Sequence, residues 1–164
     1  HYKVKATACP GTNIINGLGA LRTNVANRRT PSGKTARTVD NSSSGFSVVG
    51  TWTTGISAPD KYGADYRYKS TAPVSEPATW TTTLNTTASW TVRAWWSAGT
   101  NRSATAPYIV SHSGGTTTVN KNQQTNGGSW QTLGTWTMGG TQTVKLSCWT
   151  TTGYVVIADA VRWE

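Results

Sequence analysis

Hydrophobic and polar residues alternate along much of the chain from residue 38 onward, which is the pattern of β-strands with one buried face. Four stretches show the alternation, and their expected buried residues are Phe46, Val48 and Trp52; Ala78, Trp80 and Leu84; Trp90, Val92, Ala94 and Trp96; and Val144, Leu146 and Cys148. The segment 154–163 is apolar on both faces as far as Ala160, which predicts a strand in the centre of a sheet.

Turn-forming sequences separate these stretches, among them Ala58–Asp60, Ser113–Gly115, Asn126–Gly128 and Met138–Gly140. The spacing gives roughly eight or nine strands. We therefore predict that residues 38–164 form a mainly β domain, an antiparallel β-sandwich of jelly-roll type.

The N-terminal residues follow a different pattern. Apolar residues recur every three to four positions within 12–27, which predicts one short helix. Residues 28–37 have the Pro, Gly, Ser and charge of a linker. Residues 1–37 contain seven Lys and Arg and no acidic residue, whereas 38–164 contain eight Lys and Arg and six Asp and Glu. A basic arm attracts polyanions, such as an anionic wall polymer.

Composition limits the class of protein. The 164 residues suffice for one main domain, and only 35% of them are hydrophobic, with nine Trp and one Phe. No apolar run approaches the roughly 20 residues that cross a bilayer, so we expect no membrane partner. Nucleic acid is disfavoured as a partner, because no recognition helix is predicted and the aromatic residues are not interleaved with the basic ones.

Short motifs are spread over residues 38–164, namely Val39–Asn41, Gly45–Phe46, Gly50–Trp52, Tyr62–Tyr68, Ala94–Trp96, Gly99–Arg102, Ala106–Tyr108, Asn126–Trp130 and Ala158–Arg162. Together these motifs resemble the golvesin/xanthan-lyase-type domain, a β-sandwich module attached to secreted bacterial enzymes. The resemblance implies a β-sandwich that binds carbohydrate.

The chain begins HYKVKATACPG, with His1 eight residues before Cys9. Residues 1–27 resemble the end of a type-2 N-acetylmuramoyl-L-alanine amidase domain, the fold of peptidoglycan recognition proteins. The resemblance implies that His1 and Cys9 are zinc ligands and that Thr7 lies near the reacting carbonyl, whereas Lys3 stands where the family often has Asp. A catalytic zinc needs three protein ligands, and the family's other zinc His has no counterpart here. We therefore expect an incomplete zinc site and no cofactor in this chain, with zinc belonging to the intact parent.

No complete catalytic group is recognisable, so we assign no catalytic residue. The chain has two His and no GxSxG motif. Asp60 and Asp65 are the only plausible pair of carboxylates, and turn capping or pairing with Arg67 explains them better than glycoside hydrolysis. We expect His112, on a predicted strand, to be structural.

Two further polar groups need partners. Cys9 and Cys148 fit either one disulfide or a metal thiolate plus a buried thiol. Asp159 lies within an apolar strand, where an unpaired carboxylate is costly. We expect Asp159 to accept hydrogen bonds from backbone amides or from an arginine such as Arg67 or Arg93.

Sugar binding is the best-supported chemistry. Trp95 and Trp149 fall on the polar side of the alternation, where an exposed indole suggests a partner. The alternative is that a loop or a second sheet covers both indoles. A pyranose ring packs its C–H face on an aromatic ring while its hydroxyls need polar neighbours. Four residues in predicted loops would border the two indoles. The predicted carbohydrate-binding residues are Trp95, Trp149, Tyr62, Tyr66, Asn101 and Arg102.

The sequence therefore predicts a non-catalytic module that binds polysaccharide or peptidoglycan and belongs to a secreted bacterial peptidoglycan hydrolase, whose C-terminal part this chain would be. One alternative is a processed part of a zinc-dependent N-acetylmuramoyl-L-alanine amidase. The other is a secreted protein-interaction or inhibitor domain that binds its partner through Trp95 and Trp149.

Overall fold

The computed structural model describes residues 33–164, of which 34–164 form one compact unit. All the regular secondary-structure elements in this part are β-strands, and all their pairings are antiparallel. The predicted mainly β architecture is therefore confirmed. The strands are β1 (Arg37–Asp40), β2 (Phe46–Val48), β3 (Thr53–Gly55), β4 (Tyr66–Ser70), β5 (Ala78–Trp95), β6 (Ala106–His112), β7 (Gly115–Lys121), β8 (Gln131–Leu146), β9 (Val155–Ala158) and β10 (Ala160–Trp163).

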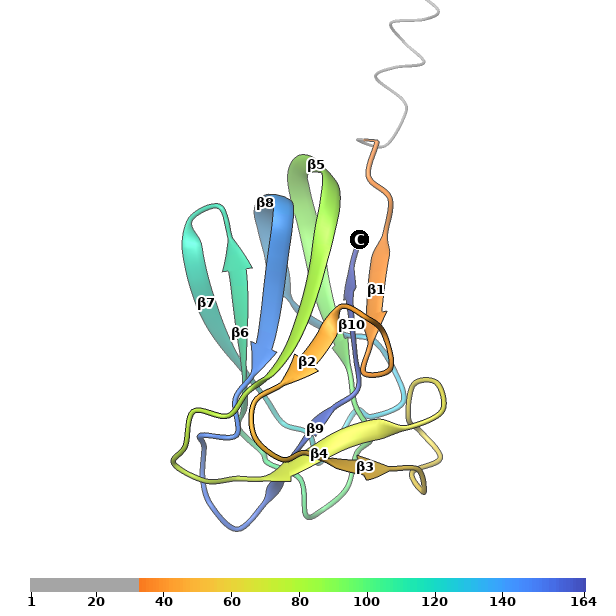
Figure 1. Ribbon diagram of the computed structural model, residues 1–164, viewed down its shortest axis with the longest axis vertical. Coiled ribbons are helices and arrows are strands. Elements are labelled where there is room, and N and C mark those ends of the chain that lie inside the picture. The colour runs from red at the N-terminus through yellow and green to blue at the C-terminus, as the bar shows by residue number, and fades with distance from the viewer. Residues whose placement is uncertain (1–32) are drawn as a thin grey trace, which may run out of the picture. The chain divides into compact units, whose positions relative to one another are not determined.

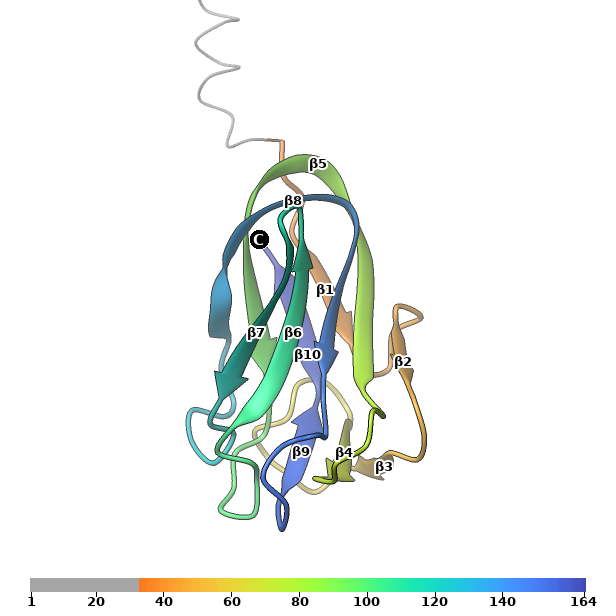
Figure 2. The same ribbon diagram turned by 90° about the vertical axis from the view of Figure 1, so that its left-hand side faces the viewer.

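Two long strands, β5 and β8, bend sharply and carry the chain from one layer of the sandwich to the other (Figure 2). They pair along most of their length, and their register shifts where Leu84 pairs with Gly140 but Ala88 pairs with Met138. Gly140 adopts a φ of +64°, a conformation that favours glycine at the bend. Each strand therefore has two limbs that lie in different layers.

The two limbs of β5 have different neighbours, and this defines the layers. Residues 78–84 pair with β2 and with the second limb of β8, which continues the sheet to β6 and β7. Residues 88–94 of β5 pair with the first limb of β8, and residues 92–95 of β5 pair with β10, whose other neighbour is β1. The arrangement gives the sheet order β1-β10-β5-β8-β6-β7, with β2 attached to β5.

The space between the layers is filled by indoles. Trp80, Trp90 and Trp96 are almost completely buried. Their Nε1 groups donate to the backbone oxygens of Asp159 at 3.1 Å, Thr86 at 3.2 Å and Thr125 at 3.0 Å, respectively. The residues predicted to face inward in the stretches 78–84, 90–96 and 144–148 are all buried, so the alternation predicted these faces correctly.

Two predictions about strands are wrong. The stretch 46–52 is not one strand with a buried even face, because β2 ends at Val48, which is 39% exposed, and buried Trp52 lies between β2 and β3. The stretch 154–163 is not one central strand, because β9 and β10 lie in different sheets and are separated by Asp159. Its residues are apolar on both faces because each half is covered by a different part of the domain.

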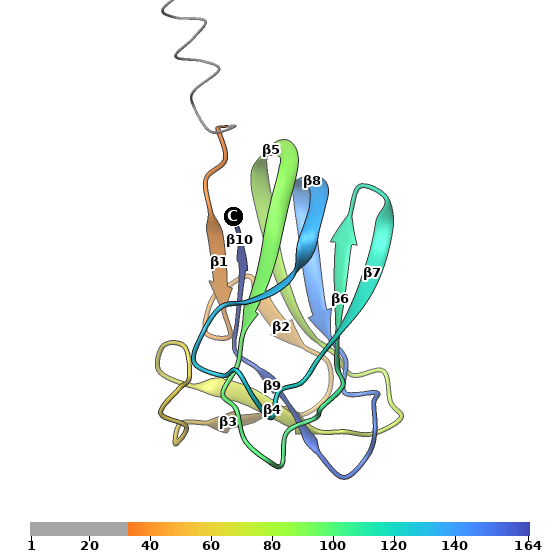
Figure 3. The same ribbon diagram turned by 180° about the vertical axis from the view of Figure 1, so that it is seen from behind.

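Strands β3, β4 and β9 form a separate small sheet at the end of the domain opposite the bends of β5 and β8 (Figure 1). The segment between β5 and β6, residues 96–105, lies at the same end (Figure 3). The helix predicted within 12–27 lies outside the described residues, and residues 33–164 contain no helix long and apolar enough to span a membrane.

Part of the segment predicted as a linker contacts the domain. Lys34 Nζ donates to the backbone oxygen of Ser89 at 2.8 Å and lies 5.2 Å from the ring centroid of Trp90. Arg37 already belongs to β1, where it pairs with Trp163. Within residues 33–164, the first strand thus begins at Arg37.

Candidate functional site

An open cleft of about 440 Å³ lies where the small sheet meets the segment 96–105. Strand β4 contributes two tyrosines, and the segment contributes an asparagine and an arginine. The lining residues are Thr54, Gly55, Ile56, Ser57, Tyr66, Tyr68, Asn101, Arg102, Val155 and Ile157. The cleft therefore combines aromatic rings with hydrogen-bonding groups, as a sugar site requires.

The position of Tyr66 depends on Gly55. The two residues are paired across β3 and β4, and the Tyr66 ring lies over the glycine. A β-carbon on Gly55 would lie 2.5 Å from Cε2 and 2.6 Å from Oη of Tyr66, far inside van der Waals contact. Glycine at position 55 therefore leaves the space in which the ring lies.

The backbone around Asn101 and Arg102 is held to β9. Val155 N donates to the carbonyl oxygen of Asn101 at 3.0 Å, and Ser103 N donates to the carbonyl oxygen of Val155 at 2.8 Å. Gln124 Nε2 donates to the carbonyl oxygen of Arg102 at 3.0 Å. These three bonds fix the backbone of the segment next to the tyrosines.

The Arg102 guanidinium packs against the backbone of Gly99. A β-carbon on Gly99 would lie 3.3 Å from Cζ of Arg102, a tight contact, so the glycine allows the close approach. Arg102 Nη1 donates to Oδ1 of Asn101, whereas Arg102 Nε has no hydrogen-bond partner.

A second hollow of about 290 Å³ adjoins the first at Tyr68, which lines both. Its lining residues are Thr51, Thr53, Tyr68, Lys69, Ser70, Ala72 and Val74. Tyr68 is paired with Thr53 on one side and with Ile157 on the other, so these three residues share one face of the small sheet. Tyr68 thus lies between the two hollows, which we together call the Tyr68 groove.

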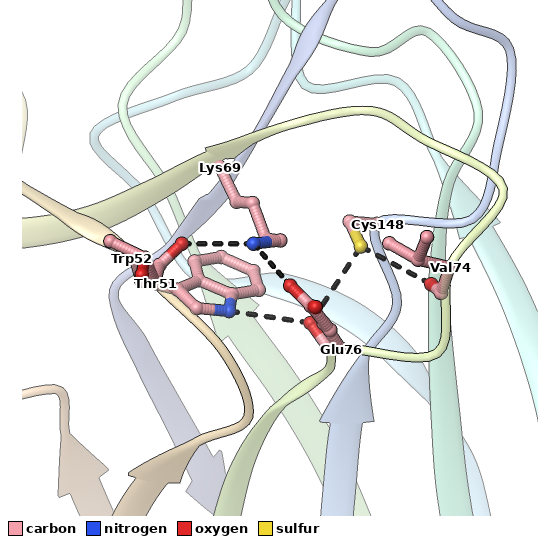
Figure 4. A network of polar contacts seen from close by, with 6 residues as sticks. All are labelled: Thr51, Trp52, Lys69, Val74, Glu76 and Cys148. Atoms are coloured by element: carbon pink, nitrogen blue, oxygen red, sulfur yellow. Dashed lines mark hydrogen bonds and ion pairs between the residues drawn. The ribbon is translucent and has the colours of Figure 1, made fainter.

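Lys69, at the second hollow, is neutralised by Glu76 (Figure 4). Lys69 Nζ lies 2.5 Å from Oε2 of Glu76 and donates to the backbone oxygen of Thr51 at 2.9 Å. The backbone oxygen of Glu76 accepts from Nε1 of Trp52 at 3.3 Å and lies 3.6 Å from Sγ of Cys148. The network joins the start of β5 to β4, and it leaves the second hollow without an uncompensated cation.

Three of the six predicted carbohydrate-binding residues, Tyr66, Asn101 and Arg102, come together in the first cleft. Tyr66 lies at the start of β4 rather than in a loop, and its ring is almost buried, so it forms part of the floor. Tyr68 was not among the predicted residues. Because residues two apart in a strand share a face, the pair Tyr66 and Tyr68 in one short strand was the signal that would have found it.

Trp95 and Tyr62 lie in a different place, in an aromatic cluster with Trp130. The ring centroids are 5.6 Å apart for Tyr62 and Trp95, 5.4 Å for Trp95 and Trp130, and 5.2 Å for Tyr62 and Trp130. Trp95 Nε1 donates to the backbone oxygen of Asp60 at 2.8 Å. Trp95 is half-buried, packs against the loop that carries Tyr62, and does not line the first cleft.

Trp149 is the opposite case, because 60% of it is exposed. It follows Cys148, whose carbonyl oxygen accepts from the backbone N–H of Ala72 at 3.0 Å. Ala72 lines the second hollow, so Trp149 lies in the chain next to that end of the Tyr68 groove.

The three aspartates considered in the sequence, Asp60, Asp65 and Asp159, each accept a hydrogen bond within the domain. Asp60 Oδ2 accepts from Ala98 N at 2.9 Å, and Asp65 Oδ1 accepts from Asn41 Nδ2. Asp159 Oδ2 accepts from Tyr62 N at 2.9 Å, which is the backbone amide partner that was expected. Arg67 and Arg93 bind elsewhere: Arg67 donates to Thr54 and Arg93 to Glu164.

Burial raises the pKa of Asp159 from its ordinary value of 3.8 to about 8, and the charges of Asp40, Asp60 and Asp65 act in the same direction. The hydrogen bond from Tyr62 opposes the shift but is smaller than the cost of burial. Asp159 is completely buried and its Oδ1 has no partner. The side chain is therefore predominantly protonated at neutral pH.

The remaining candidates are structural where they are described. His112 stacks on Trp136 with a centroid distance of 5.7 Å, and its Nε2 lies 2.9 Å from Oγ1 of Thr117. Residues 33–164 contain no group of three or more His, Cys, Asp or Glu positioned to hold a metal ion. The predicted zinc ligands His1 and Cys9 lie outside the described residues. Cys148 is buried, with Sγ 3.5 Å from the backbone oxygen of Val74.

Comparison with known proteins agrees with this architecture. Residues 37–164 match the model of the golvesin C-terminal domain. The chain is 33% identical over 131 residues to a xanthan lyase of Bacillus sp. (strain GL1), which corresponds to 76% of this chain and 14% of that protein. The structure of a Paenibacillus xanthan lyase superposes with a TM-score of 0.73 and 39% identity, covering 79% of this chain and 13% of the other.

Two smaller solved domains share the fold at 18% identity. They are a CBM35 domain from Cellvibrio japonicus, with a TM-score of 0.56 over 79% of this chain and 93% of that domain, and a CBM36 domain of a xylanase from the hindgut metagenome of Trinervitermes trinervoides, with a TM-score of 0.50 over 79% and 97%. The chain thus spans about one seventh of the xanthan lyases but nearly the whole of these two domains. With its sandwich, its small end sheet and the family match over 37–164, this chain belongs to the golvesin C-terminal domain family.

Proposed function

We propose that residues 37–164 form a carbohydrate-binding module and that the Tyr68 groove holds a segment of a polysaccharide chain. The observation that carries the proposal is the placement of Tyr66 and Tyr68 in an open cleft rimmed by Asn101 and Arg102. Tyrosine rings offer a surface for the C–H face of a pyranose, and the rim supplies donors and acceptors for its hydroxyls.

Binding without catalysis fits the groove better than hydrolysis. Within residues 33–164, neither hollow is lined by an acidic side chain, whereas a glycoside hydrolase of the usual kind needs two carboxylates across its cleft. The similarity to two domains named as carbohydrate-binding modules also supports binding. Because the groove continues past Tyr68 to the second hollow, the proposed ligand is an internal stretch of a chain longer than one sugar.

We further propose that the module belongs to a secreted peptidoglycan hydrolase and acts outside the cell. The support is the HYKVKATACPG segment, which resembles the zinc-binding end of an N-acetylmuramoyl-L-alanine amidase. A module of this kind keeps its enzyme at a high local concentration on an insoluble polymer. The basic residues of 1–37 would add attraction to anionic wall polymer.

The test is sedimentation of the 164-residue protein with insoluble peptidoglycan and chitin, and affinity electrophoresis in gels that contain xanthan. We expect retention by at least one polymer, a loss of about threefold to tenfold for Tyr68→Ala, and little change for Tyr68→Phe, which keeps the ring. Circular dichroism checks that both variants are folded. Failure of the wild-type protein to bind any of the polymers, or equal binding by Tyr68→Ala, would overturn the proposal.

The same incubations distinguish the enzymatic alternative, which the His1 and Cys9 motif favours. Soluble fragments released from peptidoglycan by the pure chain, and abolished by a zinc chelator, would assign amidase activity to the chain itself. Binding with no released fragments supports the non-catalytic module.

A further inference from the structure

The carboxylates of the described residues all have partners other than Arg102. Glutamates form the ion pairs, and aspartates accept from backbone or amide groups. The partners are Lys69 for Glu76, Arg93 and Arg162 for Glu164, Asn41 N for Asp40, Ala98 N for Asp60, Asn41 Nδ2 for Asp65 and Tyr62 N for Asp159. No ion pair of residues 33–164 includes Arg102, which lines the first cleft.

The Arg102 guanidinium is also poorly satisfied as a hydrogen-bond donor. It carries five N–H groups, and among residues 33–164 its one side-chain bond is the donation to Asn101 Oδ1. At the same time the residue is held in place, by packing on Gly99 and by the bond from Gln124 to its backbone oxygen. A fixed cation with free donors beside an aromatic floor is suited to a ligand that brings its own negative charge.

We propose that the cleft binds a sugar residue that carries a carboxylate, and that this carboxylate pairs with Arg102 while the sugar ring lies on the half-buried Tyr68, with Tyr66 as part of the floor. The inference rests on the proposed function and names the class of glycan for the same groove. A carboxylate is favoured over the phosphate of a polyol polymer, because a polyol chain has no ring face to pack on tyrosine. Two sources share the required chemistry: a uronic acid within a polysaccharide, and the lactyl or peptide carboxylate of peptidoglycan.

The preference for acid should be confined to one end of the groove. Lys69 at the second hollow already pairs with Glu76 at 2.5 Å, so that hollow offers no free charge. A bound chain is therefore expected to place one carboxylate at Arg102 and neutral, hydroxyl-bearing rings toward Val74. This asymmetry also gives the bound chain a direction.

The experiment compares each acidic polymer with a copy that has lost its charge. The probes are native xanthan and carboxyl-reduced xanthan in affinity electrophoresis, and native peptidoglycan and carbodiimide-amidated peptidoglycan in sedimentation, all at 150 mM salt. The proteins are the full chain, Arg102→Ala, Arg102→Lys and the matched control Lys145→Ala. Lys145 is exposed on β8 outside both hollows, so its removal changes the net charge equally without touching the groove.

We expect the full chain to bind a native polymer about tenfold to a hundredfold more tightly than its neutralised copy. Arg102→Ala should lose that difference, Arg102→Lys should keep part of it because an ammonium cannot bind bidentately, and Lys145→Ala should behave like wild type. The polymer that shows the difference identifies the source of the carboxylate.

Three results would overturn the inference. Equal binding of native and neutralised polymers would remove the acid preference while leaving the proposed function intact. An equal loss in Arg102→Ala and Lys145→Ala would show that only net charge matters. Absence of binding to any polymer, native or neutralised, would refute the proposed function and with it the inference.

Discussion

The ring of Tyr66 lies directly over Gly55 on the neighbouring strand, where a β-carbon would stand 2.5 Å from Cε2. The glycine and the ring together make the floor of the first cleft. We predict that Gly55→Ala displaces the ring, lowers the free energy of unfolding by about 1–3 kcal/mol and weakens polysaccharide binding. Urea unfolding and the retention assay measure the two effects. An alanine variant with wild-type affinity would show that the ring position does not matter for the ligand.

Asp159 should make the domain less stable as the pH rises. Its pKa is near 3.8 in the unfolded chain and about 8 in the fold, so between these values the folded protein holds a proton that the unfolded chain has released. The stabilisation that this group contributes is complete below about pH 4. It is lost as the pH rises through 8, at up to about 1.4 kcal/mol per pH unit.

Asp159→Asn isolates this effect, because an amide keeps the oxygen that accepts from Tyr62 N and does not titrate. Urea unfolding at pH 5, 7 and 9 should show a flatter profile for the variant, with the gain over wild type largest at pH 9. Parallel profiles for the two proteins would show that Asp159 does not carry the proton.

Substitution of Trp95 should mainly lower stability, whereas substitution of Trp149 should mainly weaken binding. Trp95→Ala removes the bond to Asp60 and the packing with Tyr62 and Trp130, so we expect a loss of about 2 kcal/mol or more in unfolding free energy. Trp149→Ala should change stability by about 0.5 kcal/mol or less, since the side chain is 60% exposed.

For binding the order is reversed. Trp149 follows Cys148, whose backbone pairs with Ala72 of the second hollow. We therefore expect Trp149→Ala to weaken binding of long oligosaccharides by about threefold to tenfold and to leave short ones unaffected. Calorimetric titration with oligosaccharides of increasing length separates the two cases. Equal effects on all lengths would place Trp149 within the main cleft instead.

Glu76→Gln should release Lys69 without removing any aromatic contact. Lys69 has a side chain only 14% exposed, so losing its partner should cost about 1–2 kcal/mol of unfolding free energy. The freed ammonium adds a second cation to the groove, and we expect tighter binding of polyuronates that carry a charge on every ring. Lys69→Met should show the stability loss without the gain in affinity.

The alternation of residues predicted most of the buried faces because the layers of a sandwich select one side of each strand. It predicted Trp80, Trp90 and Trp96 as core, and all three are buried. It could not show that β5 bends over from one layer to the other, because the alternation continues on both sides of the bend. It also could not separate β9 from β10, since a strand buried by two different sheets has the same composition as one central strand.

The candidate site was also predicted only in part. Motif resemblance and loop position selected Tyr66, Asn101 and Arg102, which the fold gathers in one cleft. Strand-face reasoning also selected Trp95, but the polar face of a strand is exposed only where no loop covers it. The contact between Trp95 and Tyr62 joins distant parts of the chain, so no local sequence pattern contains it.

The bends in β5 and β8 tie the layers together by continuous backbone. The two layers cannot separate unless both strands straighten. Ala78 pairs with Leu146, which lies far along the chain, so this pair forms only after β8 has reached β5. Such distant pairings favour slow folding and a single cooperative melting step. The groove at the opposite end is accordingly expected to lose its shape only when the whole domain unfolds.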